Sequence, residues 1–298
     1  MKICTLCPRN CQVDRWEGKT GVCGQTGELK VARAALHYWE EPCISGKEGS
    51  GAVFFSGCPL HCVFCQNQNI ANGTVGKTIS VERLTNIFLE LQEKGANNIN
   101  LVTAGHFAPW VAQALKAAKD QGLEIPIVYN TSGYETVETL RSLEGLIDIY
   151  LPDFKYMDAH LSEKYSHAAD YSQIASAALA EMVRQTGPAV FENGDEEGLM
   201  KRGTIVRHLI LPGCTEDSKR VIRYLHETYG NQIYISIMNQ FTPLDGLKAY
   251  PELNRKVTEE EYDDVVDYAI ALGVECGFVQ EGDTAEESFI PEFDCEGV

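Results

Sequence analysis

Six short apolar runs, rich in β-branched residues, recur along the chain and limit its fold more than any other feature. Segments with the 3.6-residue periodicity of amphipathic helices separate them. Strands that alternate with helices predict a parallel sheet, because a crossover helix returns the chain to the start of the next parallel strand. The runs are residues 52–56, 98–103, 126–130, 147–153, 205–211 and 233–238. The pattern predicts an α/β fold, a partial (β/α)6 TIM-like barrel whose chemistry gathers at the carboxyl ends of the strands.

Several helix ends are visible in the sequence. Ser80 is a good N-cap for an apolar stripe that begins at Val81, and Gly95 follows the end of that stripe. Thr258 and Glu261 have the spacing of a capping box. The long connection over residues 157–203 is expected to contain at least one helix.

Three cysteines directly follow the first predicted strand with the spacing C-x3-C-x2-C, and we call them the loop cysteines: Cys58, Cys62 and Cys65. Three thiolates on one short loop can hold three irons of a [4Fe–4S] cubane and leave the fourth iron open to another ligand. The alternatives are a structural zinc site or three buried thiols. Zinc normally requires four ligands, and His61, which lies between two of the cysteines, is poorly placed to be the fourth.

A second group, the N-terminal cysteines, has the spacing C-x2-C-x3-C-x11-C and consists of Cys4, Cys7, Cys11 and Cys23. Four thiolates in twenty residues can bind zinc or a second [4Fe–4S] cluster. Cys43 is either an alternative ligand or a buried small residue. We therefore predict a cysteine-rich metal-binding module over residues 1–50 and a barrel over residues 51–298.

The charge and the apolar pattern argue against some partners and locations. The net charge of −18 disfavours nucleic acid, because phosphate contacts require a basic surface. No run of eighteen apolar residues is present, which disfavours a membrane protein, and the first residues do not resemble a signal peptide. Clustered cysteines in a chain of 298 residues indicate metal binding in a reducing compartment, and we expect a cytoplasmic protein.

The stretch Phe-Phe-Ser-Gly-Cys-Pro-Leu-His-Cys-Val-Phe-Cys resembles the cluster loop of radical S-adenosylmethionine (SAM) enzymes, in which an aromatic residue, here Phe64, precedes the third cysteine. The chain resembles pyruvate formate-lyase activating enzymes, and above all their relatives with an additional N-terminal four-cysteine module. Further motifs carry the likeness: Cys-Thr-Leu-Cys-Pro-Arg-Asn-Cys, Glu-Pro-Cys-Ile-Ser-Gly, Tyr-Asn-Thr-Ser-Gly-Tyr-Glu and Ile-Asp-Ile-Tyr-Leu-Pro-Asp-Phe-Lys-Tyr. The resemblance implies a radical SAM barrel that binds a [4Fe–4S] cluster and SAM, and takes electrons from a reduced flavodoxin or a ferredoxin-type donor.

The resemblance also implies SAM-contacting residues at successive strand ends: Thr103, Gly105, Asn130, Ser132, Asp153, Lys155, Arg207, Asn239 and Gln240. The segment at Gly105 lacks the family's acidic residue, and Asn130 stands where activating enzymes have an aspartate. Asn130 and Ser132 are equally compatible with a plain turn. Arg207 occupies the family's place for the SAM carboxylate, and the alternative for this cation is a salt bridge to a neighbouring acid.

Three functions are compatible with these features. The first is an activating enzyme that removes the α-hydrogen of a glycine in a partner enzyme. The second is a radical SAM enzyme that acts on a small metabolite or a peptide, with a lid over the same site. The connection over residues 157–203 is long enough to be either a docking surface or that lid. The third is a non-enzymatic iron–sulfur redox or sensing protein, which would need four cysteines at each cluster.

Overall fold

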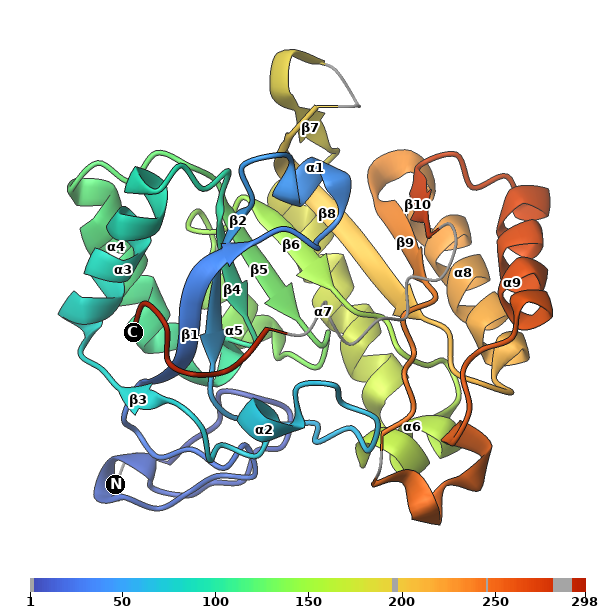
Figure 1. Ribbon diagram of the computed structural model, residues 1–298, viewed down its shortest axis with the longest axis horizontal. Coiled ribbons are helices and arrows are strands. Elements are labelled where there is room, and N and C mark those ends of the chain that lie inside the picture. Colours follow the sequence, from blue (N-terminus) through green and yellow to red (C-terminus); the bar gives the residue numbers. More distant parts are fainter. Residues whose placement is uncertain (1–2, 195–197, 245, 281–290) are drawn as a thin grey trace.

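The computed structural model describes residues 3–194, 198–244, 246–280 and 291–298. Within them, strands join in the order β10-β9-β8-β6-β5-β4-β2-β1-β3, and β7 pairs with β8. Strands β2, β4, β5, β6, β8, β9 and β10 run parallel. At one edge β1 pairs antiparallel with β2, and β3 pairs antiparallel with β1. In the described residues the edge strands β3 and β10 do not pair, so the predicted partial barrel is confirmed as an open, mostly parallel sheet (Figure 1).

All six predicted strands are present, with ends that differ by a few residues. The strands are β1 Lys30–His37, β2 Ser50–Phe55, β3 Lys77–Thr78, β4 Ile99–Val102, β5 Ile127–Thr131, β6 Ile149–Pro152, β7 Val190–Phe191, β8 Met200–Leu209, β9 Tyr234–Met238 and β10 Gly277–Val279. The largest shift is in β8, which begins at Met200 because its first residues pair with β7. The sequence analysis did not identify β1, β3, β7 and β10.

The helices alternate with the strands as expected. They are α1 Pro42–Ser45, α2 Gln68–Ala71, α3 Val81–Glu93, α4 Ala108–Asp120, α5 Val137–Ser142, α6 Ala159–Ser166, α7 Tyr171–Thr186, α8 Thr215–Tyr229 and α9 Glu259–Leu272. The Ser80 hydroxyl caps α3 by accepting from the Arg83 N–H at 3.0 Å. Both bonds of the Thr258–Glu261 capping box form at α9. The connection over residues 157–203 contains α6, α7 and β7.

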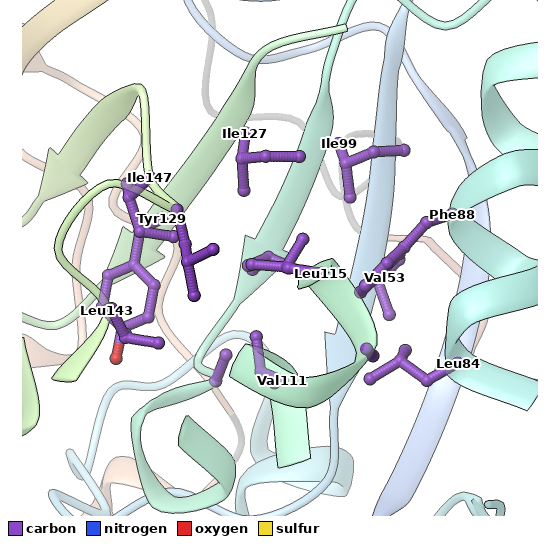
Figure 2. Packing of buried hydrophobic residues seen from close by; sticks show 14 of the residues in the cluster. Val53, Leu84, Phe88, Ile99, Val111, Leu115, Ile127, Tyr129, Leu143 and Ile147 are labelled. Carbon is purple, nitrogen blue, oxygen red and sulfur yellow. The ribbon is translucent and has the colours of Figure 1, made fainter. Parts of the chain in front are cut away.

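A large core lies between the sheet and helices α3 and α4 (Figure 2). Val53, Ile99 and Ile127 come from neighbouring parallel strands and are fully buried. Figure 2 shows these side chains beside Leu115 of α4 and, at the β2 side, Phe88 of α3. Because these residues are apolar at strand and helix spacing, burial of their surface fixes the strands in register and so fixes where the strand ends lie.

The first fifty residues contribute directly to the sheet. Strand β1 pairs antiparallel with β2, with Val31 opposite Phe55 and His37 opposite Ser50. The C-terminal tail lies along the other side of β1, where the Ala34 N–H donates to the Glu296 carbonyl at 2.9 Å (Figure 1). The division at residue 50 remains a prediction, although β1 itself belongs to the sheet. None of the helices in the described ranges is both long and apolar enough to cross a membrane.

Candidate active site at the strand ends

A cavity of about 430 Å³ lies at the carboxyl ends of the parallel strands. Its lining includes residues at or next to the ends of five of them: Val102, Asn130, Asp153, Leu209 and Met238. The volume falls in the range of small-molecule sites. The strand-end location is the one predicted from the alternating pattern, because loops that follow parallel strands meet at one edge of the sheet.

The loop that carries Cys58, Cys62 and Cys65, which we call the cysteine loop, follows β2 and forms one wall of this cavity. Leu60 and Phe64 anchor the loop by packing into a core cluster that includes Phe241, whose ring centroid lies 6.1 Å from that of Phe64. Cys62 and Cys65 line the cavity. The Ser166 hydroxyl donates to the Cys62 sulfur at 3.0 Å, so one loop cysteine already receives a hydrogen bond that favours its thiolate.

The loop cysteines are close enough for their charges to interact, and burial keeps them protonated when no cation is near. Burial, followed by the neighbouring thiols, raises the pKa of Cys65 to about 12, and burial with Cys62 raises the pKa of Cys58 to about 11. Buried thiols of this kind release their protons when they bind metal. Among the described residues, no three His, Cys, Asp or Glu side chains are grouped as ligands of a single ion. Three thiols on one loop and an adjoining cavity fit a [4Fe–4S] cluster that has one open iron.

An ionic network occupies the polar side of the cavity. The Arg207 guanidinium donates to Asp153 at 3.1 Å, to Glu40 at 3.0 Å and to the Asn130 side-chain oxygen at 2.6 Å. The Lys155 ammonium donates to Asp153 at 2.6 Å. Burial raises the pKa of Asp153, but Lys155 and Arg207 outweigh it and hold this pKa below its usual range. Two cations and two carboxylates therefore share one partly buried network.

The cations of this network keep donors available for a ligand. Arg207 uses one N–H on each of its three nitrogens, and a guanidinium has five N–H groups, so two remain. Burial lowers the pKa of Lys155, but the Asp153 carboxylate raises it above its usual range, so Lys155 stays charged. Arg207 forms the salt bridges of the second alternative and also lines the cavity, while its role at the SAM carboxylate stays a prediction.

Two neighbouring acids in the cavity were missed by the sequence analysis. Glu40 and Glu41 follow β1, and the side chain of Glu40 accepts from Asn100 at 2.9 Å and from Asn130 at 3.2 Å. Burial raises the pKa of Glu41, although Arg207 opposes the shift, and one carboxyl oxygen of Glu41 has no partner among the described residues. The only available signal was the adjacent pair of acids before Pro42, in a segment assigned to the metal module.

The remaining predicted residues occupy different places. Gln240 lines the cavity, and its carbonyl accepts from the Gln66 side chain at 2.8 Å. The others do not line it: Thr103, Gly105, Ser132 and Asn239. Gly105 packs against Glu135, whose carboxyl oxygen would lie 2.3 Å from an added Cβ, so this glycine is required by packing. A role for these four residues at SAM remains a prediction that the cavity does not support.

Three of the N-terminal cysteines, Cys4, Cys7 and Cys23, are buried. Cys43 lies elsewhere, in a core cluster with Ile149 and Leu151, so the structure separates it from this set. Its burial agrees with the alternative of a small core residue.

Comparison with known proteins supplies the identity of the central region. The model of the radical SAM superfamily matches residues 52–185, which include the cysteine loop and β2 to β6. This region of the chain matches the radical SAM superfamily. An uncharacterized protein of Methanocaldococcus jannaschii is 29% identical over 279 residues, which are 90% of this chain and 74% of that protein. Radical SAM domains imply an enzyme that binds a [4Fe–4S] cluster and SAM.

Two solved structures share the fold of the radical SAM domain and its surroundings. SuiB from Streptococcus suis, in a structure with bound S-adenosylmethionine, is 14% identical over 76% of this chain, with a TM-score of 0.51. HydG, a maturase of the [FeFe]-hydrogenase, is 16% identical over 76% of this chain, with a TM-score of 0.50. The matched regions are 49% and 50% of those chains, so this protein spans about half of each.

Proposed function

We propose that this chain cleaves SAM reductively at a [4Fe–4S] cluster on the loop cysteines and removes hydrogen from a glycine in a partner protein. The observation that carries the proposal is one cavity lined both by Cys62 and Cys65 and by the Arg207–Asp153–Lys155 network. When bound, the cluster supplies one electron to SAM, which yields the 5′-deoxyadenosyl radical that the family uses. A reduced flavodoxin or ferredoxin-type protein is the proposed donor.

In this proposal the chain's own residues bind and orient SAM. The free N–H groups of Arg207 and Lys155 would donate to the SAM carboxylate. Asp153, whose Oδ1 accepts from Arg207 and whose Oδ2 accepts from Lys155, would keep both cations in place. The neutral form of Glu41 would offer a proton donor beside Ser236. These groups supply position and charge, which is the protein's share of the chemistry.

A polypeptide substrate is supported by the rim of the cavity. Trp39 and Val279 both line the cavity, and 58% and 53% of their surfaces are exposed. Large apolar side chains that are both exposed and part of a cavity are typical of surfaces that bind another chain. This favours the activating-enzyme function over a small metabolite held in a closed site.

The test is anaerobic incubation of reconstituted protein with SAM and a one-electron reductant. We expect 5′-deoxyadenosine and methionine from the wild type and none from Cys62→Ala, because two thiolates cannot hold the cubane. Cys214→Ala is the matched control, because Cys214 lies at the start of α8, outside the cavity lining. Cleavage by Cys62→Ala at the wild-type rate would contradict the cluster assignment. The glycine is tested by supplying a partner enzyme with α-deuterated glycine and measuring deuterium in 5′-deoxyadenosine.

A further inference from the structure

The segment that carries the N-terminal cysteines packs against the cysteine loop and α2. Figure 1 shows this segment beneath α2 and the lower ends of β1 and β2. The Gln25 side chain donates to the Gly73 carbonyl just after α2, and an added Cβ at Gly24 would lie 3.2 Å from the Asn72 carbonyl. The segment is therefore packed closely against the sheet and α2.

Within the segment, the four N-terminal cysteines lie near one another. Cys7 interacts electrostatically with Cys4 and Cys23, and Cys23 interacts with Cys4 and Cys11. A Cβ at Gly21 would lie 3.2 Å from the Cys11 sulfur and 3.5 Å from the Cys23 sulfur, so the glycine leaves room beside both. Both sulfurs therefore lie beside the same glycine, close enough to bind one shared centre.

A buried cation accompanies these sulfurs. Arg15 is 1% exposed, and its guanidinium lies 3.8 Å from the Cys4 sulfur. It also donates to the His106 carbonyl at 2.6 Å and the Thr26 carbonyl at 2.7 Å. No carboxylate among the described residues forms an ion pair with it, although buried charges are normally paired. An anionic metal–thiolate centre would supply the missing negative charge.

The same segment contacts the loop that carries Cys58. An added Cβ at Gly57 would lie 2.5 Å from the Cys23 carbonyl oxygen, and Gly57 directly precedes Cys58. The His61 ring bonds to the Val22 carbonyl at 2.7 Å. His61 has φ of +52°, in the left-handed region that non-glycine residues seldom occupy, so this contact helps to hold the loop conformation. The backbone at Cys23 therefore lies against the residue that directly precedes Cys58.

We propose that Cys4, Cys7, Cys11 and Cys23 hold a second [4Fe–4S] cluster that relays single electrons to the cluster on the loop cysteines. A low-potential one-electron carrier reduces the N-terminal cluster. That cluster is reoxidised as it passes the electron to the loop cluster, which passes it to SAM, so one electron enters and leaves at each step. The relay rests on the proposed function, whereas the presence of the second cluster does not.

The environment favours iron–sulfur over zinc. Zinc has no redox chemistry, so a zinc site would gain nothing from its position one residue from the loop cysteines. A [4Fe–4S] cluster on the same four thiolates could exchange single electrons with a cluster on the loop cysteines.

Metal content tests the second cluster. The wild type should bind about eight irons per chain, and the variants that replace either cysteine set by alanine should each bind about four. Cys43→Ala is the control and should keep the wild-type content, since Cys43 lies in a separate core cluster. The variant lacking the loop cysteines should also give the electron paramagnetic resonance signal of a reduced cluster. One zinc per chain, or no metal, in that variant would overturn the proposal.

The outcomes separate this proposal from the proposed function. If the loop assignment is wrong, removing the loop cysteines leaves all of the iron in place. If the N-terminal assignment is wrong, removing the N-terminal cysteines leaves all of the iron in place. If the variant that lacks all four N-terminal cysteines fails to fold, the variant that lacks the loop cysteines still tests the second cluster, because its N-terminal cysteines are intact.

The relay is tested by rapid mixing with two reductants. Reduced flavodoxin should bleach the loop cluster of the wild type in a fast phase, and this phase should be lost in Cys11→Ser, whose N-terminal cluster lacks one ligand. Dithionite, a small reductant that reaches the cavity directly, should reduce the loop cluster equally fast in both proteins. Equal rates with flavodoxin would overturn the relay.

Discussion

Replacing Arg207 by alanine should lower both the stability of the protein and its affinity for SAM. Arg207 donates three charge-assisted hydrogen bonds in the cavity network. After its removal Asp153 keeps Lys155, but Glu40, whose side chain is only 8% exposed, keeps only two amide donors. Removing one partner of a buried ion pair costs about 3–5 kcal/mol. For a chain of this size that lowers the melting temperature by on the order of 5–10 °C.

The loss of SAM affinity has a separate cause. A charge-assisted hydrogen bond to a carboxylate contributes about 1.5–3 kcal/mol. Its loss should weaken SAM binding by about ten- to a hundredfold. The visible absorption of the cluster should persist, because Arg207 is not among the cysteine ligands. Titration with SAM under anaerobic conditions measures the affinity, and the absorption spectrum reports on the cluster.

A double-mutant cycle tests the structural part of the argument. Glu40→Gln in the Arg207→Ala background removes the unpaired carboxylate, so the double variant should be more stable than the sum of the single effects predicts. The expected coupling is about 0.5–3 kcal/mol. Arg202→Ala is the control, because Arg202 is exposed on the same strand, β8. Additive effects would refute the Arg207–Glu40 pairing, and unchanged SAM affinity of folded Arg207→Ala would exclude Arg207 from the SAM site.

Three further predictions concern the fold. Burial raises the pKa of Glu135 to about 7 from 4.5, so the folded protein holds a proton that the unfolded chain releases, and the free energy of unfolding should fall as pH rises between these values. Glu135→Gln should remove this dependence on pH and raise the free energy of unfolding at pH 8 by about 3 kcal/mol, measured by urea unfolding. Glu124→Gln on the surface should change neither. Thr258→Ala should cost about 1 kcal/mol through the lost cap of α9, seen as a lower urea midpoint. Leu115→Ala should cost about 2–5 kcal/mol because it opens a cavity in the core of Figure 2, and a smaller loss would mean that the core collapses around it.

The local patterns of the sequence predicted the elements and the place of the site. Short apolar runs identified β2 and the five parallel strands from β4 to β9 that follow it in the core. A strand that is buried on both faces must be apolar along its length. Ser80 and Thr258 marked helix starts, since their hydroxyls satisfy backbone N–H groups nearby in sequence. The cysteine loop followed from the spacing of its ligands alone.

Contacts between distant segments could not be predicted in this way. Glu40 reaches Arg207 only because β1 pairs antiparallel with β2 and brings residues 40 and 41 to the cavity. Gly105 was expected at SAM but packs against Glu135, a constraint set by a residue thirty positions later. Neither relation has a periodicity or spacing that the sequence displays.

The sequence by itself determined which segments become strands and helices, and which three cysteines share a loop, because those properties depend on residues close together in the chain. Only the tertiary structure decided that Glu40 and Glu41 enter the cavity and that the carbonyl of Cys23 lies against Gly57. These contacts arise when the sheet orders its strands and buries its core. The charged groups at the cavity and the cysteines near Gly57 are brought together by packing that occurs elsewhere in the molecule.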